Sequence, residues 1–243
     1  EEKILQGIAF IQQHRGRYLS RTARSVSQEI CGFLEKLPQV IRLEVTGSIR
    51  RCCETTKDVD VVASSNDPSG LADAFSSSDQ VDHVTGKGDT KVSVVLKSGM
   101  SADLRIVDDD SFPYVLHHFT GSKEHNTLLR KRAKDRGLKL NEYGLFKGDE
   151  RIPCDDEAGL FAALDLAYIP PELREGRGEI ESAEEGEFPP LVELSDLLGT
   201  LHVHTHHSDG RHSVEDMAKA AMDLGHKYIG ICDHSRAAAY ANG

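Results

Sequence analysis

Two neighbouring stretches decide the fold of this chain: Thr46-Gly47-Ser48-Ile49-Arg50-Arg51 and Lys57-Asp58-Val59-Asp60-Val61-Val62. They describe a glycine-serine turn with two arginines, then two aspartates that enter an apolar run. Side chains at i and i+2 on a β-strand point to the same face, so Asp58 and Asp60 are predicted to stand side by side. Carboxylates this close repel each other unless a cation lies between them, and hard divalent ions such as Mg²⁺ bind carboxylate oxygens. The alternative is an edge strand with two solvated aspartates.

Composition is that of a globular protein in a reducing compartment. The chain has 243 residues, of which 38% are hydrophobic and 28% charged, which allows two domains or one domain with additions. No apolar run reaches transmembrane length, no signal peptide is recognisable, and the five cysteines show no CxxC spacing. We therefore expect a cytoplasmic monomer with no membrane partner.

The charge is unevenly distributed along the sequence. The net charge of −11 argues against a protein that coats nucleic acid, because phosphate contacts require clustered Lys and Arg. Residues 175–193 are markedly acidic, whereas basic clusters lie earlier, and local basic patches still allow DNA binding. These earlier basic residues include Arg50, Arg51, Arg130, Lys131, Arg132, Lys134, Arg136 and Lys139.

Hydrophobic periodicity predicts an α+β fold with a mixed sheet and helices. Residues 2–13, 22–36 and 69–75 have helical spacing. Alternation of apolar and polar residues predicts strands, the first of them half-buried with Ile41 on its apolar side. The predicted strands cover residues 41–45, 59–63, 91–96 and 102–107.

The second half of the sequence is predicted to be mainly helical at first. Helical spacing extends from residue 112 to about residue 140, a two-stranded element follows at 139–147, and another helix covers 155–166. Residues 176–190 are acidic, contain Gly and Pro and are weakly apolar, which predicts a domain linker. A second apolar pattern begins near Leu191.

A third carboxylate, Asp103, lies on the last of the predicted strands, where it alternates with Ala102 and Leu104. If this strand is adjacent to the strand of Asp58 and Asp60, three carboxylates converge. Such a set can bind two metal ions roughly 3.5–4 Å apart, which promote in-line displacement at phosphorus. The alternative for Asp103 alone is an ordinary surface aspartate.

Together these residues resemble the nucleotidyltransferase palm of the family X DNA polymerases. The string from His118 to Asn126, with Arg130 four residues later, is similar to the segment with which this family selects nucleotides, and residues 141–144 are similar to its thumb. The resemblance implies that Asp58, Asp60 and Asp103 are catalytic and bind Mg²⁺ or Mn²⁺. The other residues that it implies for nucleotide binding are Gly47, Ser48, Arg51, His118, Phe119, Gly121, Asn126 and Arg130.

The resemblance also implies a role for each nucleotide-binding residue. Ser48 and Arg51 would contact the β- and γ-phosphates of a dNTP, and Gly47 would let the backbone approach them. The forked donors of an arginine suit a phosphate. In the selection segment, Phe119 would form a wall beside the sugar, Asn126 would contact the base edge, and Arg130 would contact the template side of the nascent pair. His118 occupies a position where animal members of the family carry Tyr.

Histidines at the end of the sequence form a second informative pattern. His202 and His204 are two residues apart on a predicted strand, Asp209 follows in the next turn, and His234 ends a later apolar strand. Imidazole and carboxylate groups together suit Zn²⁺, Mn²⁺ or Fe²⁺. The pattern resembles the opening of a PHP (polymerase and histidinol phosphatase) phosphoesterase barrel, which implies a Zn²⁺ or Mn²⁺ site from these four residues. Further ligands of that family would lie beyond residue 243, so we expect this site to be incomplete here.

The two resemblances predict the domains. Residues 1–37 would close a helix-hairpin-helix DNA-binding domain, 38–115 form the palm, 116–175 a small α/β thumb, 176–190 the linker, and 191–243 the first strands of a PHP (β/α) barrel. The first residue is not Met, and the sequence stops directly after a motif, so we expect a bacterial fragment cut at both ends.

The predicted function is template-directed transfer of a dNMP to a primer 3′-hydroxyl with release of pyrophosphate. DNA and dNTP would be the partners, short-gap filling in base-excision repair the context, and 3′–5′ exonuclease or phosphoesterase activity the task of the PHP part. One alternative is another nucleotidyltransferase of the superfamily. A second is a DNA-binding protein whose only chemistry is PHP nuclease activity.

Overall fold

The computed structural model describes residues 16–186, 188 and 190–243, which form two compact units that divide after Phe188. The predicted helix over residues 2–13 lies outside the described residues. In the described part, no helix combines the length and apolar character needed to cross a membrane. The mixed α+β fold predicted from the sequence is confirmed.

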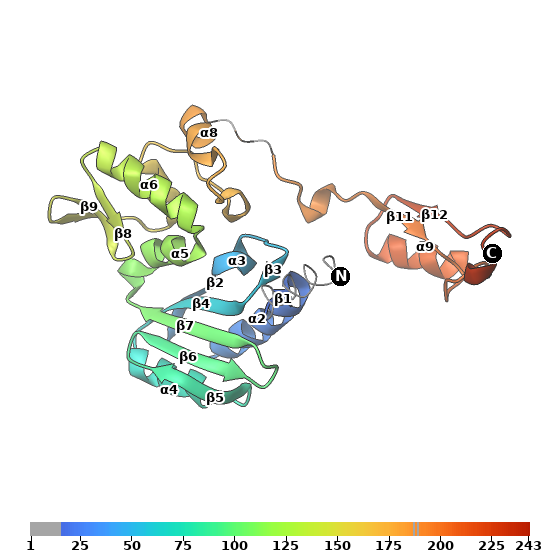
Figure 1. Cartoon of the computed structure of the whole chain (residues 1–243), viewed down its shortest axis with the longest axis horizontal. Coiled ribbons are helices and arrows are strands. Elements are labelled where there is room, and N and C mark those ends of the chain that lie inside the picture. Colours follow the sequence, from blue (N-terminus) through green and yellow to red (C-terminus); the bar gives the residue numbers. More distant parts are fainter. Residues whose placement is uncertain (1–15, 187, 189) are drawn as a thin grey trace, which may run out of the picture. The chain divides into compact units, whose positions relative to one another are not determined.

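The first unit is built on a five-stranded sheet in the order β2-β4-β7-β6-β5 (Figure 1). Strands β4 and β7 are parallel, and the other neighbours are antiparallel. The strands are β2 (Val40–Val45), β4 (Asp58–Ser65), β5 (Val81–Lys87), β6 (Lys91–Leu96) and β7 (Ser101–Val107). A separate antiparallel pair joins β1 (Tyr18–Leu19) to β3 (Thr55–Thr56).

Helices α2 (Ser20–Leu34) and α4 (Pro68–Ser76) share one hydrophobic core with this sheet. Their buried residues, such as Ile30 and Phe75, pack with Val59 and Val61 of β4. Residues between Tyr18 and Leu37 therefore contribute to the core of this sheet, while the DNA-binding domain expected over 1–37 stays a prediction. The apolar face of α2 is covered by the sheet.

The first strand differs from the predicted alternation. Ile41 is 52% exposed, although the pattern places it on the half-buried side. The pairing of β2 with β4 shifts between Val40 and Arg42, and such an irregularity reverses the side to which a residue points. Strand β5 is an addition, because the sequence pattern did not predict it.

The rest of the first unit is helical, with a small sheet. The helical character predicted from residue 112 to about 140 is confirmed in two helices, which are separated because Gly121 has φ +70° and Ser122 caps the second helix through His125 N. The sheet has three strands rather than two, in the order β10-β9-β8. The elements are α5 (Phe112–Thr120), α6 (Lys123–Asp135), β8 (Lys139–Asn141), β9 (Gly144–Lys147), β10 (Glu150–Ile152), α7 (Glu157–Ala162) and α8 (Glu179–Glu185), with the 3₁₀ turns η1 (Asp109–Ser111) and η2 (Pro171–Leu173).

The segment predicted as a linker is partly folded. Helix α8 buries Ile180 and Ala183 in the same core cluster as Leu129 of α6 and Phe161 of α7. Residues 176–186 thus belong to the first unit. The acidic composition concealed this, because one of the acids, Glu179, is itself buried.

The second unit contains one β-α-β element. Strands β11 (Gly199–Val203) and β12 (Tyr228–Ile231) are parallel and are connected through α9 (Val214–Asp223), whose N-terminus has a capping box between Ser213 and Asp216. The 3₁₀ turns η3 (Leu194–Asp196) and η4 (Ala239–Ala241) complete it. A barrel remains a prediction.

Candidate active site and metal cluster

The three predicted catalytic carboxylates lie on the two parallel strands of the first sheet. Asp60 of β4 and Asp103 of β7 are direct Cα partners, and Asp58 precedes Asp60 by two residues, so all three belong to one face. Residues of the opposite parity, such as Val59 and Ala102, enter the core with α2 and α4. The apolar side of each strand therefore directs the aspartates to the other side.

Asp60 carries the clearest electrostatic signal of this face. Burial, followed by the neighbouring carboxylates Asp58 and Asp103, raises the pKa of Asp60 to about 6, against the opposing influence of Lys91 and Arg105. Lys91 Nζ lies 2.6 Å from Asp103 Oδ2. A divalent cation between the three carboxylates would offset their mutual repulsion, which is one of the causes that raise the pKa of Asp60. The donor set thus fits Mg²⁺ or Mn²⁺.

The glycine-serine turn begins α3 (Gly47–Arg50) directly beside Asp60. Thr46 N donates to Asp60 O over 2.8 Å, and a Cβ on Gly47, whose φ is +63°, would lie 3.0 Å from Asp60 Oδ2. Ser48 Oγ donates to Thr56 Oγ1 over 2.8 Å. The close approach for which a glycine is needed is therefore made to the carboxylate of Asp60.

A pocket of about 600 Å³ collects most of the predicted nucleotide-binding residues. Arg105, two residues beyond Asp103, lies over the Phe119 ring at 4.2 Å and so joins the carboxylate strand to this pocket. Gly47 and Ser48 do not line it. The predicted residues that do are Arg51, His118, Phe119, Gly121, Asn126 and Arg130, joined by Ser122, Lys123, Glu124, Thr127 and Glu175.

Hydrogen bonds hold the selection segment in position. Asn126 Nδ2 donates to His118 O over 2.8 Å, and Arg130 Nη2 lies 3.0 Å from His118 Nδ1. Burial, and then the charges of Arg130 and Arg105, lower the pKa of His118, so that its neutral ring accepts from Arg130. Asn126 Oδ1 is buried and has no hydrogen-bond partner among the described residues. It is an acceptor that a bound ligand could use.

Arg51 is held by residues far away in the sequence. Its Nε lies 2.7 Å from Glu175 Oε1, and its Nη1 donates to Thr120 O. Gly121, with φ +70°, lies against the same guanidinium, since a Cβ there would be 3.2 Å from Arg51 Nη1. We call residues 174–179 the strap, because they connect α3, the selection segment and α8. The sequence did not single out Glu175.

A buried ion pair network anchors the beginning of the strap. Glu157 binds Arg50 of α3 at 2.6 Å and also Arg174, whose side chain is fully buried. Burial raises the pKa of Glu157, but Arg174 and Arg50 outweigh it and hold that pKa below its ordinary value. Arg50 Nη1 also donates to Thr120 Oγ1 over 2.8 Å. This network joins α3 to α7 and to the end of α5.

A second buried network anchors the end of the strap. His125 Nδ1 lies 2.8 Å from Glu179 Oε1, and the Gly176 and Arg177 N–H groups donate to the same carboxylate. Burial opposes ionisation of Glu179, but these hydrogen bonds lower its pKa to about 2. His117 lies 3.3 Å from His125, and burial, followed by the charge of Arg174, keeps its pKa well below the usual value.

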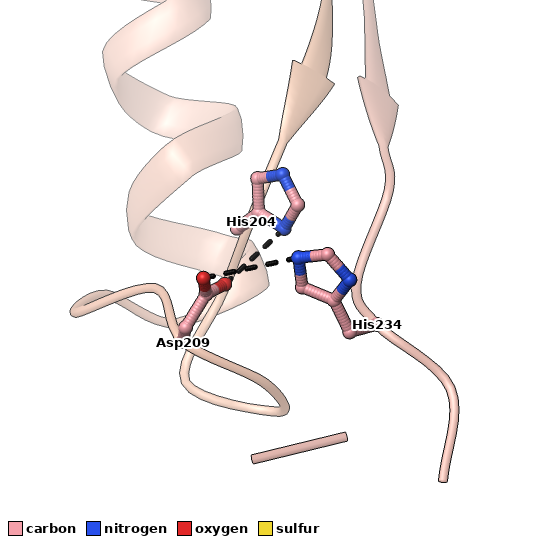
Figure 2. A group of neighbouring side chains, drawn as sticks. All are labelled: His204, Asp209 and His234. Atoms are coloured by element: carbon pink, nitrogen blue, oxygen red, sulfur yellow. Dashed lines mark ion pairs between the residues drawn. The ribbon is translucent and has the colours of Figure 1, made fainter. Parts of the chain in front are cut away.

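In the second unit, three predicted metal ligands meet. Among the described residues, His204, Asp209 and His234 form a group whose ligand atoms all lie within 4.8 Å of one another; the aspartates of the first sheet form no such group. Figure 2 shows the Asp209 carboxylate directed to both imidazoles, at 3.3 Å from His204 Nδ1 and 3.8 Å from His234 Nε2. His204 Nδ1 is buried without a hydrogen-bond partner. The donor set and this atom fit Zn²⁺ or Mn²⁺.

The fourth predicted ligand, His202, lies outside this group. A residue that was not predicted, Asp233, fixes the loop that carries one of the three ligands. His202 is exposed, has φ +61°, and its ring centre lies 5.0 Å from that of His204. Asp233 accepts from Thr205 N, Thr205 Oγ1 and Ser208 Oγ, which lowers its pKa to about 2 and fixes the loop that carries Asp209. The one sequence signal for a role of Asp233 was its position directly before the predicted ligand His234.

Comparison with known proteins shows which polymerases this sequence resembles. Residues 115–175 match the family of the DNA polymerase beta thumb. The whole chain is 36% identical over 247 residues to "DNA polymerase/3'-5' exonuclease PolX" of Bacillus subtilis (strain 168), and covers 43% of that protein. Over 75 residues, 30% of this chain, it is 37% identical to "DNA-directed DNA/RNA polymerase mu" of Homo sapiens, of which it covers 15%. Over 64 residues, 26% of this chain, it is 36% identical to "Repair DNA polymerase X" of African swine fever virus, of which it covers 37%.

The chain is therefore a homologue of the family X DNA polymerases. Its helical part carries a thumb of the DNA polymerase beta type over residues 115–175. The family resemblance predicted from the sequence is confirmed, while the PHP resemblance stays a prediction. The chain spans less than half the length of each of these relatives.

Proposed function

We propose that the first unit is a template-directed DNA polymerase that transfers a dNMP to a primer 3′-hydroxyl. One observation supports this most: Asp60 and Asp103 are Cα partners, and Arg105 of the same strand contacts Phe119 in the pocket. The carboxylates that would serve the reaction at phosphorus are thus connected to the residues that would hold the nucleotide. The names of the relatives point to the same chemistry.

Two divalent ions bound at Asp58, Asp60 and Asp103 would activate the attacking hydroxyl and stabilise the leaving pyrophosphate. The site needs these carboxylates ionised. Because the pKa of Asp60 is about 6, its carboxylate is mostly charged at neutral pH even without a bound ion.

The nucleotide itself would be held by groups of different chemistry. Arg51 lies in the pocket wall and offers forked donors to the triphosphate. The Phe119 ring, already covered by Arg105 on one side, offers a flat apolar surface to the sugar. Asn126 keeps a free buried acceptor in the same pocket. An N–H donor on the edge of a base would match that acceptor. This supports Asn126 as a contact to the nascent base pair.

DNA is the partner that this function requires, and gap filling in repair is the context that we propose for it. The acidic balance of −11 does not oppose DNA binding, because exposed basic residues such as Lys131 and Lys134 gather on α6. Repair is also named in the viral relative. The rival reading, a nucleotidyltransferase that needs no template, makes no use of Arg130 or Asn126.

The decisive experiment is extension of a primer at a one-nucleotide gap, with Mg²⁺ or Mn²⁺ and each dNTP in turn. We expect the full chain to add the dNTP that is complementary to the template base, and to add it faster than the other three. Equal addition of all four dNTPs, or addition to single-stranded DNA alone, would support the template-independent rival. No addition under any of these conditions would refute polymerase activity of this chain.

We further propose that the second unit binds Zn²⁺ or Mn²⁺ as part of a PHP phosphoesterase site. The approach of His204, Asp209 and His234 to one another carries this proposal, with His202 as a further ligand after a local change of its backbone. A bound ion of this kind supplies an activated water for the hydrolysis of phosphoesters. The exonuclease named in the Bacillus relative is consistent with such a site.

Substitution of one ligand tests this cluster directly. We expect His204→Ala to weaken the binding of Zn²⁺ or Mn²⁺ by at least roughly 10- to 100-fold, since even partners of metal ligands have effects of that size. His206→Ala is the matched control, because His206 is an exposed histidine of the same loop, outside the group, with its ring centre 4.5 Å from that of His207. Isothermal titration calorimetry measures both affinities. Equal affinities of the two variants would exclude His204 as a ligand.

A further inference from the structure

Three of the five N–H donors of the Arg51 guanidinium have partners in the protein. Its Nε pairs with Glu175 Oε1 at 2.7 Å, its Nη1 donates to Thr120 O, and its Nη2 lies 3.8 Å from Cys53 Sγ. The side chains of Arg51 and Glu175 are only 14% and 30% exposed. A phosphate that is to take the Nε edge of this guanidinium must displace the Glu175 carboxylate, which occupies it. Of the three partners, only Glu175 is an anion.

The position of Glu175 is fixed by its neighbours on the strap. Arg174 is buried in the Glu157 pair, and its carbonyl accepts from Ser122 N over 2.9 Å. On the other side, a Cβ on Gly176, whose φ is +69°, would lie 2.8 Å from the Glu124 side chain. The backbone on both sides of Glu175 is therefore tied down. Movement of the carboxylate away from Arg51 requires rotation of its side chain alone.

We propose that Glu175 is an internal competitor for the phosphate site at Arg51, and that an incoming polyphosphate binds by displacing its carboxylate. This inference rests on the proposed function insofar as Arg51 is a triphosphate ligand. The carboxylate presents to Arg51 the same kind of anionic oxygen that a phosphate would. Because Glu175 is tethered beside Arg51, it competes at a high effective concentration that a weakly charged anion does not overcome.

This competition would make the pocket selective for highly charged phosphates. A triphosphate carries more negative charge than one carboxylate, and Lys123 in the same pocket wall adds a further cation for it. A monophosphate would gain less and would leave Glu175 in place. The specificity for nucleoside triphosphates thus has a contribution from a residue that does not touch the nucleotide.

Equilibrium binding of inorganic tripolyphosphate to the full chain tests this proposal without DNA, dNTP or catalysis. We expect Glu175→Gln to tighten tripolyphosphate binding roughly three- to fivefold, the upper part of the range for the loss of one partly exposed ion pair. The matched control is Glu172→Gln, which removes the same charge three residues earlier, next to Cys52 Sγ at 3.6 Å. We expect it to change the affinity less than about twofold.

Two further variants make the outcome decisive. The double variant Arg51→Ala with Glu175→Gln should lose the gain, because the competitor acts only through Arg51. Glu175→Ala should show the same gain as Glu175→Gln, and provides the answer if the glutamine variant does not fold. Unchanged or weaker binding in the folded variants, or an equal gain in Glu172→Gln, would overturn the proposal.

The gap-filling experiment separates this proposal from the proposed function. If the chain fills no gap but Glu175→Gln tightens tripolyphosphate binding, the proposal for Glu175 stands and the proposed polymerase activity fails. If the chain fills gaps but Glu175→Gln leaves the tripolyphosphate affinity unchanged, the proposed polymerase activity stands and the proposal for Glu175 fails.

Discussion

A chain with Asp103→Ala is expected to fill a one-nucleotide gap at least about 100-fold more slowly than the unaltered chain, the size of effect seen when one preorganised charge-stabilising group is removed from an active site. Asp103 is the Cα partner of Asp60, and these two with Asp58 make up the proposed metal-binding set. With alanine at 103, the metal-binding set loses the one carboxylate that β7 supplies.

Protonation of the remaining aspartates would not explain this loss. Asp103 is one of the groups that raise the pKa of Asp60, so its removal favours the ionised form of Asp60. Lys91 also loses its partner Asp103 and becomes available to lower that pKa further. The expected defect is therefore that of a missing ligand, and it should persist at pH 8.

The control for this variant is Asp110→Ala. Asp110 follows the same strand by three residues, and its side chain is 85% exposed beside Arg151. Gap filling by this variant is expected to remain within about twofold of the unaltered chain, since surface substitutions away from such sites have small effects. Equal rates for Asp103→Ala and Asp110→Ala would remove Asp103 from the catalytic set.

The substitution Glu157→Ala is expected to lower the free energy of unfolding of the first unit by about 3–5 kcal/mol. Removing one partner of a buried ion pair leaves an uncompensated charge in the interior, which costs about this much. Here two arginines lose their carboxylate partner at once, and both are in the interior, since Arg174 is fully buried and the Arg50 side chain is 15% exposed. Urea denaturation followed by circular dichroism measures the change through the midpoint and the slope.

Glu150→Ala provides the comparison for that measurement. Glu150 is an exposed carboxylate on β10 of the same unit, so its removal should change the free energy of unfolding by less than about 0.5 kcal/mol. If Glu157→Ala were as stable as Glu150→Ala, the arginines would have to be satisfied by other groups, and the connection from α3 to the strap would not depend on Glu157.

The strands at the candidate active site were predictable because their pattern is local. β4, β6 and β7 begin within one residue of the predicted positions, since β6 and β7 alternate buried residues with less buried ones and β4 enters a continuous buried run after Asp60. β5 has no such pattern. Its residues beyond Val81 are exposed, so the strand depends on pairing with β6 rather than on burial of its own side chains.

The placement of the site was predictable only as far as local rules reach. The same-face rule placed Asp58 with Asp60, and the alternation of β7 placed Asp103 on a strand. The partners of these residues depend on tertiary contacts. Glu175 lies 124 residues from Arg51, and Glu179 lies 54 residues from His125, so no spacing in the sequence links them.

The anchoring of α8 decides where this chain can be divided for separate production of its two halves. The match to the thumb family ends at residue 175, whereas the compact unit continues to Phe188. A cut at the family border would remove the Glu179 carboxylate from buried His125 and expose the core that Ile180 and Ala183 cover. A soluble first unit should therefore end after residue 188, and a shorter piece should aggregate because its core is exposed, whatever the state of the candidate active site.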